Sequence, residues 1–326
     1  MRFAGLVENE ILKISRQRRF RVVVFILVAL IGLIVFAQSR GRERFLGGKD
    51  WHVRTQERMA NIQNWLRDGR MPASSQRWSR FELGRLKYHL ERDIDPEAIS
   101  GPLFTRAFAN ASSYLLLPLL AIVFASDIVS AEFQQGTIKI LLTRPVGRVR
   151  VLASKLVALM LAITLTTVFG AAVAYAFGGI AYGYRGWAAP VLTGFRIGGQ
   201  SFDPAGVRSI ELWKETILVF GLAWFAMLCV GAIALLSSVL LRSTAAAMGT
   251  MVAALIAGSI LPRLASQWEA QKFLFVTCLP LPDYYSGSPP PITGLTIGFA
   301  ASVLAAWAIA ALITAFVVFA RRDVLA

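Results

Sequence analysis

The residue types that most often carry out catalysis or bind metals are scarce in this sequence. Its 326 residues include only two cysteines and two histidines. Neither Cys229 and Cys278 nor His52 and His89 have the spacing of a metal or redox site. No window matches the GxxxxGK(S/T) loop that binds ATP phosphates, the GxSxG nucleophile elbow or the HExxH zinc motif. We therefore expect a non-catalytic chain with no cofactor-binding or metal-binding residues of its own.

Charged residues are also few. They make up 16% of the sequence, against 56% hydrophobic residues and a mean hydropathy of +0.58. A helix needs about 20 largely apolar residues to cross a hydrocarbon layer of about 30 Å. Six stretches meet this requirement: residues 21–38, 108–129, 152–178, 215–241, 244–261 and 294–320. None of them alternates like a barrel strand. The sequence therefore predicts an all-α polytopic membrane protein with six transmembrane helices and both termini on one side.

Lysines and arginines near the span ends predict the orientation. They lie at the N-terminus, in the 130–155 turn, at Arg242, and at Arg321 and Arg322. Because short cytoplasmic segments are enriched in Lys and Arg, we expect both termini to be cytoplasmic. The net charge of +15 is spread over loops and helix ends. We therefore expect membrane lipids as partners and no nucleic acid.

Two predicted helical segments lie outside the spans. Residues 1–20 place apolar side chains at helical intervals, interrupted by Glu10, and predict a cytoplasmic amphipathic interfacial helix before the six-helix domain of residues 21–326. A frayed terminus is the alternative. Residues 40–101 carry two helical patterns separated by a breaker-rich segment, and predict an extracytoplasmic helical subdomain. This subdomain would contact a substrate or accessory protein, or act only as a solvated spacer.

Two further connections differ in composition. The glycine-rich segment 179–214 predicts an irregular, mobile connection. Residues 262–291 are apolar, too short to span, and broken by prolines, so they predict a re-entrant or extracytoplasmic segment.

Small residues recur at every fourth position in the last two spans, a pattern that lets helices approach closely. We favour packing within the bundle as its cause over a seam between two copies of the chain. The positions are Ala245, Gly249, Ala253 and Ala257 in the fifth span, and Gly294, Gly298, Ser302, Ala306 and Ala310 in the sixth.

The centres of the spans contain no side chain suited to ion coupling. Proton-coupled and ion-coupled carriers usually need ionisable groups near the middle of the bilayer. Asp127 and Glu132 flank the inner end of the second span, where we expect headgroups and water to solvate them. An external energy source is therefore favoured.

The turn 130–150 has the pattern of a short rigid lever. Gly136 can end the preceding helix, Thr137 can cap a short new one, and Pro145 can stop it. Between them lies an apolar knob, bracketed by charges that would fix the register of a contact. The knob includes Ile138, Leu141 and Leu142, and the bracketing residues are Glu132, Arg144 and Arg148. The alternative is a basic loop that only enforces topology.

Ten residues of this region occur in the order D….E…GT…LL.RP..R……K: Asp127, Glu132, Gly136, Thr137, Leu141, Leu142, Arg144, Pro145, Arg148 and Lys155. This order resembles the ABC type 2 transporter permeases, most specifically over residues 125–157 and loosely over the whole chain. The resemblance implies a permease subunit of the bacterial cytoplasmic (inner) membrane that works in export. It further implies a separate ABC ATP-binding subunit, which holds ATP and Mg and receives the 130–150 element in a groove, and a second permease copy or related permease. The insert 40–101 departs from the compact exporters of that family.

Two hypotheses from other classes stay open. The chain could be a membrane scaffold or sensor, with residues 40–101 as its receptor and the inner turn as its signalling contact. It could also be a secondary carrier, which the uncharged centres of the spans disfavour.

Overall fold

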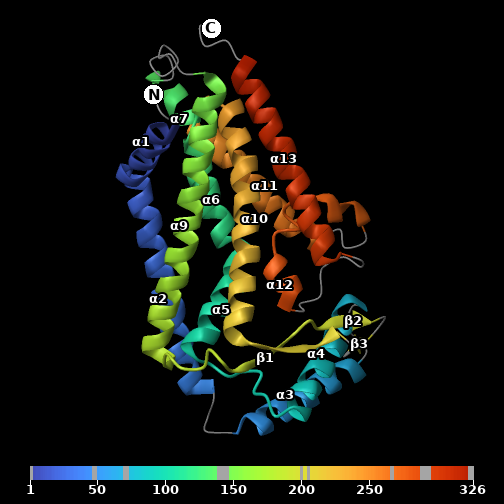
Figure 1. The fold of residues 1–326 in the computed structure, drawn as a ribbon. Helices are drawn as coiled ribbons and strands as arrows, with labels where there is room; N and C mark the ends of the chain where they lie inside the picture. Colours follow the sequence, from blue (N-terminus) through green and yellow to red (C-terminus); the bar gives the residue numbers. More distant parts are fainter. Residues whose placement is uncertain are drawn as a thin grey trace.

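The computed structural model describes residues 3–45, 50–68, 73–137, 147–198, 201–203, 206–264, 268–286 and 295–321. It is an all-α polytopic membrane protein with very little sheet. Six helical segments are long and apolar enough to cross a membrane: Arg18–Arg40, Leu116–Gln134, Arg148–Tyr182, Leu212–Leu240, Thr244–Leu261 and Ile297–Arg321. This confirms the predicted number of spans. Helix α1 begins and helix α13 ends at the same end of the bundle (Figure 1), which we call the α1 end.

The bundle is built around α10 (Leu212–Leu240), which contacts α5, α6, α9, α11 and α13. Its buried residues run along most of its length and include Val219, Ala226 and Leu235. The surrounding helices are α2 (Arg18–Phe45), α5 (Gly101–Ser113), α6 (Leu116–Asp127), α9 (Arg148–Tyr182), α11 (Thr244–Leu264) and α13 (Ile297–Arg321). Helix α1 (Phe3–Arg16) lies against α9, so the predicted N-terminal helix is present.

The second span is broken, which corrects the prediction of one helix over 108–129. Helix α5 ends at Ser113, α6 begins at Leu116, and the short α7 (Ser130–Gln134) follows. The break precedes Pro118, whose ring would clash with the carbonyl of Tyr114 in a continuous helix. Tyr114 instead donates its hydroxyl to the carbonyl of Ser259 in α11 (3.2 Å).

The opposite end of the molecule carries a small subdomain, and we call it the subdomain end (Figure 1). Helices α3 (Trp51–Arg67) and α4 (Ala73–Glu91) pack together there, where the sequence predicted two helices. Ile62 and Leu86 of the two predicted patterns are buried. The subdomain is therefore helical as expected.

The connection 179–214 is more regular than predicted, because two short antiparallel strand pairs form within it. Strand β1 (Pro190–Thr193) pairs with β4 (Arg208–Glu211), and β2 (Arg196–Gly198) pairs with β3 (Ser201–Asp203). The turn after β1 uses Gly194 at φ +80°, a conformation that glycine adopts at low cost. Leu192 and Phe195 then pack on Phe81 of α4 in a small second core. This contact with α4 orders a segment that composition alone marks as irregular.

The described part of the 262–291 connection packs against the bundle. Helix α11 continues to Leu264, past the predicted boundary at 262. A 3₁₀ turn (Glu269–Phe273) and the short helix α12 (Leu281–Ser286) follow, and α12 contacts α5, α10 and α13. Leu279 and Leu281 are fully buried there. The re-entrant or extracytoplasmic placement of this segment stays a prediction.

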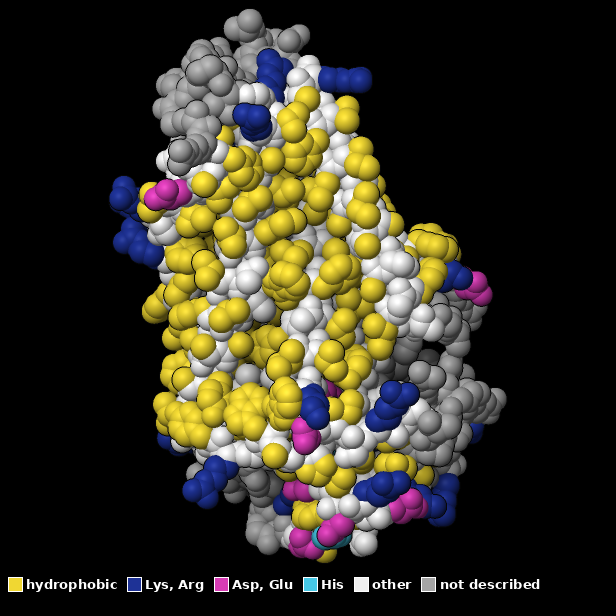
Figure 2. Space-filling model, in the orientation of Figure 1, with side chains coloured by type: hydrophobic (Ala, Val, Ile, Leu, Met, Phe, Trp, Pro, Cys, Tyr) yellow, Lys and Arg dark blue, Asp and Glu magenta, His cyan; other side chains and the backbone are white. Residues whose placement is uncertain are grey.

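The surface of the bundle is apolar. Figure 2 shows hydrophobic side chains spread over its length, whereas charged side chains gather toward its two ends. Exposed apolar residues include Phe25 in α2, Leu165 in α9, Ile217 in α10 and Ile313 in α13. Such a surface is expected where lipid replaces water as the solvent.

The small-residue stripes of α11 and α13 lie on this surface, so our preference for packing within the bundle is wrong. All their described positions are exposed: Ala245, Gly249, Ala253 and Ala257 in α11, and Gly298, Ser302, Ala306 and Ala310 in α13. A Cβ added at Gly249 or Gly298 would meet no atom within 4 Å. These faces are therefore open to lipid or to another protein.

Candidate functional site

Four charged side chains form a closed ring of ion pairs at the α1 end. Lys155 of α9 donates to Glu10 of α1 (3.0 Å) and to Glu132 of α7 (2.6 Å). Lys13 of α1 donates to the same two carboxylates, at 3.1 Å to Glu10 and 3.0 Å to Glu132. Two acids and two bases therefore neutralise one another, and we call these four residues the charge ring.

Three side chains of the charge ring are largely withdrawn from solvent, whereas that of Lys13 is 43% exposed. The side chain of Lys155 is 1% exposed and that of Glu10 is 7% exposed. The positions follow from helical geometry, because Glu10 and Lys13 lie three residues apart on one face of α1, and Lys155 lies in the second turn of α9. Burial alone would lower the pKa of Lys13, but Glu132 and Glu10 outweigh burial and raise it. Lys13 therefore stays charged.

A second polar network holds the junction between α6 and α7. Asp127 accepts from Arg19 of α2 (2.5 Å) and from Thr244 of α11 (3.3 Å). Ser238 of α10 accepts from the backbone N–H groups of Val129 (3.1 Å) and Ser130 (3.0 Å). Its hydroxyl donates to the carbonyl of Ser126 (2.9 Å). The backbone groups freed where the helix breaks are therefore satisfied by α10.

These contacts correct the expectation that headgroups and water solvate Asp127 and Glu132. Asp127 is 8% exposed as a residue, and the side chain of Glu132 is 12% exposed. Each carboxylate is bound by a basic side chain from another helix. The acids therefore fasten the end of the second span to α1, α2 and α9.

The predicted lever begins directly beyond this anchored junction. Helix α7 ends at Gln134, and Gly136 has φ +69°, as expected for a residue that ends a helix. The hydroxyl of Thr137 donates to the carbonyl of Glu132 (3.4 Å), so Thr137 binds back to α7. The rest of the predicted lever, residues 138–146, lies outside the described residues. This segment includes the helix that Thr137 was predicted to cap, with Ile138, the knob residues Leu141 and Leu142, and the flanking Arg144 and Pro145.

Arg148 lies where the chain enters α9. Its guanidinium donates to the carbonyl of Ala320 near the end of α13 (3.1 Å). The structure therefore brings Glu132, Gly136 and Thr137 together, and it places Arg148 against a different helix.

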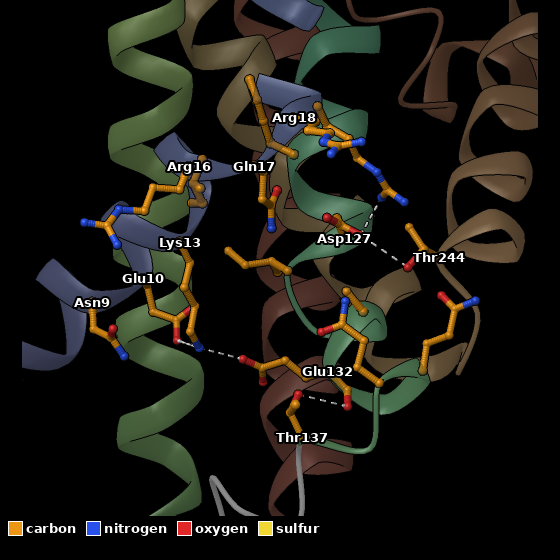
Figure 3. Close-up of a pocket in the computed structure, with 17 residues that line it drawn as sticks. Asn9, Glu10, Lys13, Arg16, Gln17, Arg18, Asp127, Glu132, Thr137 and Thr244 are labelled. Carbon is orange, nitrogen blue, oxygen red and sulfur yellow. Dashed lines mark hydrogen bonds and ion pairs between the residues drawn. The ribbon is translucent and has the colours of Figure 1, made fainter. Parts of the chain in front are cut away.

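A polar cavity of about 700 Å³ separates α1 from the α6–α7 junction. Figure 3 shows Glu10 and Lys13 on one side of it and Asp127 with Thr244 on the other, while Glu132 reaches from the side of Asp127 toward Lys13. Gln17, at the bend between α1 and α2, and Arg18 also line it. In the described part of the chain no cluster of three His, Cys, Asp or Glu residues could hold a metal ion. The site is an assembly of ion pairs around a junction of helices.

Sequence reasoning missed three members of the charge ring, Lys13 as well as Glu10 and Lys155. Glu10 was noted only as an interruption of an apolar stripe, and Lys155 was part of the recognised order but not of the predicted contact. Both could have been found from the sequence, because an ionisable residue on an apolar helix face is costly to bury unless it has a partner. Each therefore indicated an ion pair. A third buried pair, Arg106 of α5 with Glu215 of α10 (2.9 Å), lies toward the subdomain end.

Comparison with known proteins places this chain among membrane proteins. A family model described as "Protein of unknown function (DUF2705)" matches residues 95–325. The Bacillus subtilis (strain 168) protein "Uncharacterized protein YhcI" is 24% identical over 98% of this chain and 99% of its own length. A second protein from that strain, "Uncharacterized membrane protein YdbK", is 31% identical over 64% of this chain and 78% of its own length. The family match spans α5 to α13, and therefore includes Glu132 and Lys155.

Proposed function

This chain belongs to the DUF2705 family, and we propose that it is the membrane-spanning permease subunit of an ABC transporter, driven by a separate ATP-binding subunit. We place it in the bacterial cytoplasmic membrane with the α1 end toward the cytoplasm. In this proposal ATP and Mg are bound and hydrolysed by the partner, and this chain forms the translocation pathway of an exporter.

The observation that carries the proposal is the ion pair between Glu132 and Lys155. Glu132 lies four residues before Gly136, where the predicted lever begins, and Lys155 is fully buried in the longest span. A force applied to residues 138–146 therefore reaches α9 and, through Glu10, α1. Removing one partner of a buried ion pair typically costs about 3–5 kcal/mol, because the other charge is left buried and unpaired, so separating α7 from α9 is disfavoured. A loop that only enforced topology would not need this ion pair.

The mechanism that follows is a rigid-body switch. Closure of two ATP-binding subunits would push the levers of two permeases, and the ring would make α1, α7 and α9 move together. The second permease copy, or a related permease, would pack on the exposed small-residue faces of α11 and α13. The remaining apolar surface would contact membrane lipids. We assign no nucleic acid partner, because the basic residues are spread over loops and helix ends.

The proposal is tested by recovery of the ATP-binding subunit. Leu141→Asp with Leu142→Asp would place two charges in the predicted apolar contact. We expect the variant to insert normally and to lose an ATP-binding-cassette protein that co-purifies with the wild-type chain from its native membrane. The matched control is Val53→Asp with Trp65→Asp, which adds two charges at exposed apolar positions of α3 and should leave recovery unchanged. Equal recovery with all three chains would overturn the proposal.

One observation supports the alternative of a sensor or scaffold. The subdomain end carries a folded unit with its own small core, in which Phe81 of α4 packs against Leu192 and Phe195. A sensor would respond to an external ligand without any ATP-binding partner. The absence of an ATP-binding-cassette protein from wild-type preparations, together with ligand-dependent recruitment of a different cytosolic protein, would favour it.

A further inference from the structure

A second cavity lies at the subdomain end, between the subdomain and the bundle. Its volume is about 720 Å³, within the range of roughly 300–1,000 Å³ that is typical of ligand sites. Helix α4, the chain from 93 to 99, helix α5 and strand β1 supply its walls. It is separate from the charge ring, which lies at the α1 end.

Apolar and aromatic side chains make most of the wall. Trp78 and Phe81 come from α4, Phe104 from α5, and Phe195 from the turn after β1. Phe104 belongs to the main core of the bundle, whereas Phe81 and Phe195 belong to the core of the subdomain. The cavity is thus a joint between two packed units, a common place for a ligand site.

Nearly every charge on the wall is already neutralised. Arg85 makes two bonds of 2.9 Å to Glu82, and Arg106 makes one of 2.9 Å to Glu215. The acidic residues Asp93 and Glu97 are paired with His52 (2.9 Å) and Arg58 (3.1 Å) respectively. Burial lowers the pKa of His89, so its ring is neutral near pH 7. These groups give the cavity little net preference for the charge of a ligand.

Asp95 is the exception. One of its oxygens accepts from the backbone N–H of Glu97 (2.8 Å), which fixes the turn. No basic side chain pairs with its carboxylate among the residues that the structure describes. One carboxylate without a basic partner therefore stands in a wall whose other charged residues are paired and whose remaining residues are apolar or uncharged.

We propose that this cavity binds a cationic amphiphile, whose apolar body lies against the aromatic wall and whose positive group lies at Asp95. Its use as a substrate site for transport rests on the function proposed above, whereas the binding itself does not. Because the cavity adjoins the first turns of α5 at the predicted outer surface of the membrane, an amphiphile would reach it from the outside or from the outer leaflet.

The test uses the purified full chain in lipid nanodiscs without any ATP-binding subunit. The probes are dodecylamine and dodecanoic acid, each carrying a photoreactive diazirine on the alkyl chain, with labelled residues located by mass spectrometry. We expect dodecylamine to label the segment 78–110 at least about fivefold more than dodecanoic acid, the factor that corresponds to a partly exposed ion pair. Equal labelling of that segment by the two probes would overturn the charge preference and with it the proposal.

Two pairs of variants locate the effect. Asp95→Asn keeps the hydrogen bond to the turn but removes the charge, and should abolish the preference for the amine; Asp68→Asn, at the exposed end of α3, is its control. Ala107→Trp fills the cavity from an exposed position of α5 and should remove labelling by both probes. Ala111→Trp changes an exposed position one turn later that does not line the cavity, and should have no effect. Labelling unchanged in Ala107→Trp would overturn the site.

The outcomes separate this inference from the function proposed above. Binding at the cavity by a chain that recovers no ATP-binding subunit would support the inference and count against the transporter. Recovery of the ATP-binding subunit by a chain whose cavity shows no selective labelling would support the transporter and count against the inference.

Discussion

Lys155 of α9 lies 2.6 Å from Glu132 of α7, and its side chain is 1% exposed. An ammonium group at that depth is held there only by its partners, since burying an unpaired charge is very costly. The pair joins the longest helix of the bundle to the short helix that precedes the predicted lever. The contact therefore constrains the fold, and in the proposed function it also transmits motion.

Replacing Lys155 by Met should destabilise the protein strongly, because the two largely buried carboxylates of Glu10 and Glu132 would be left with Lys13 as their one remaining base in the charge ring. We expect a loss of about 3–5 kcal/mol, measured by denaturant unfolding of the detergent-purified chain. The control is Lys87→Met, which removes an exposed pair with Glu91 (3.9 Å) and should cost less than about 1 kcal/mol. A Lys155→Met protein as stable as the control would show that the ring is not formed.

Removing the hydroxyl of Ser238 should loosen the junction between α6 and α7. Ser238→Ala leaves the N–H groups of Val129 and Ser130 buried without an acceptor, at a cost of about 1–3 kcal/mol. Hydrogen exchange of these two amides should accelerate before global unfolding. Ser302→Ala is the control, because that exposed hydroxyl bonds only within its own helix, to the carbonyl of Phe299 (2.8 Å). Unchanged exchange at both amides would rule out the role of Ser238.

The sequence predicted the spans well, because a run of about 20 apolar residues depends only on local composition. It predicted the ion pairs poorly, because Glu10 and Lys155 are 145 residues apart and only the packing of α1 on α9 brings them together. Pro118 was a local signal for the break in the second span. The contact of Tyr114 at the break with Ser259 of α11 could not be predicted, because the two residues are far apart in the sequence. The sequence did not indicate the strands near 190–211, because this segment is rich in glycine and its regular structure depends on contact with Phe81.

The two histidines should titrate in opposite directions. Burial alone would lower the pKa of His52, but the hydrogen bonds and charges of Asp50 and Asp93 together outweigh it and raise that pKa. Burial lowers the pKa of His89. His52 therefore adds stability below its unfolded pKa of about 6.5, and this is lost as pH rises through its folded pKa. His89 contributes stability above that unfolded pKa, which is lost as pH falls through its lower folded pKa.

Because the chain has two histidines, two imidazole signals suffice to test this by NMR. One signal should titrate above about 6.5 and the other below it. His52→Gln should remove the first and His89→Gln the second. Two midpoints that coincide near 6.5 would contradict both environments.

Gly136 should be sensitive to substitution for a reason of backbone conformation alone. Its φ is +69°, and an added Cβ would meet no atom within 4 Å, so any cost is that of a left-handed residue, about 1–2 kcal/mol. Gly136→Val should therefore redirect the chain that leaves α7 and reduce recovery of the ATP-binding subunit, whereas Gly136→Asn should be tolerated because Asn visits this region more readily.

The matched control for Gly136 lies at the other end of the same turn. Gly147 has φ −61° and equally open surroundings, so Gly147→Val should leave the backbone and the recovery unchanged. If Gly136→Val and Gly147→Val behave alike, the left-handed turn does not direct the lever, and the path of force from residues 138–146 to Glu132 would have to run through another contact. The other outcome is that only Gly136→Val loses recovery of the ATP-binding subunit, while unchanged hydrogen exchange in α7 shows that the charge ring is intact. The direction of the lever and the strength of its anchor would then be separate requirements for coupling.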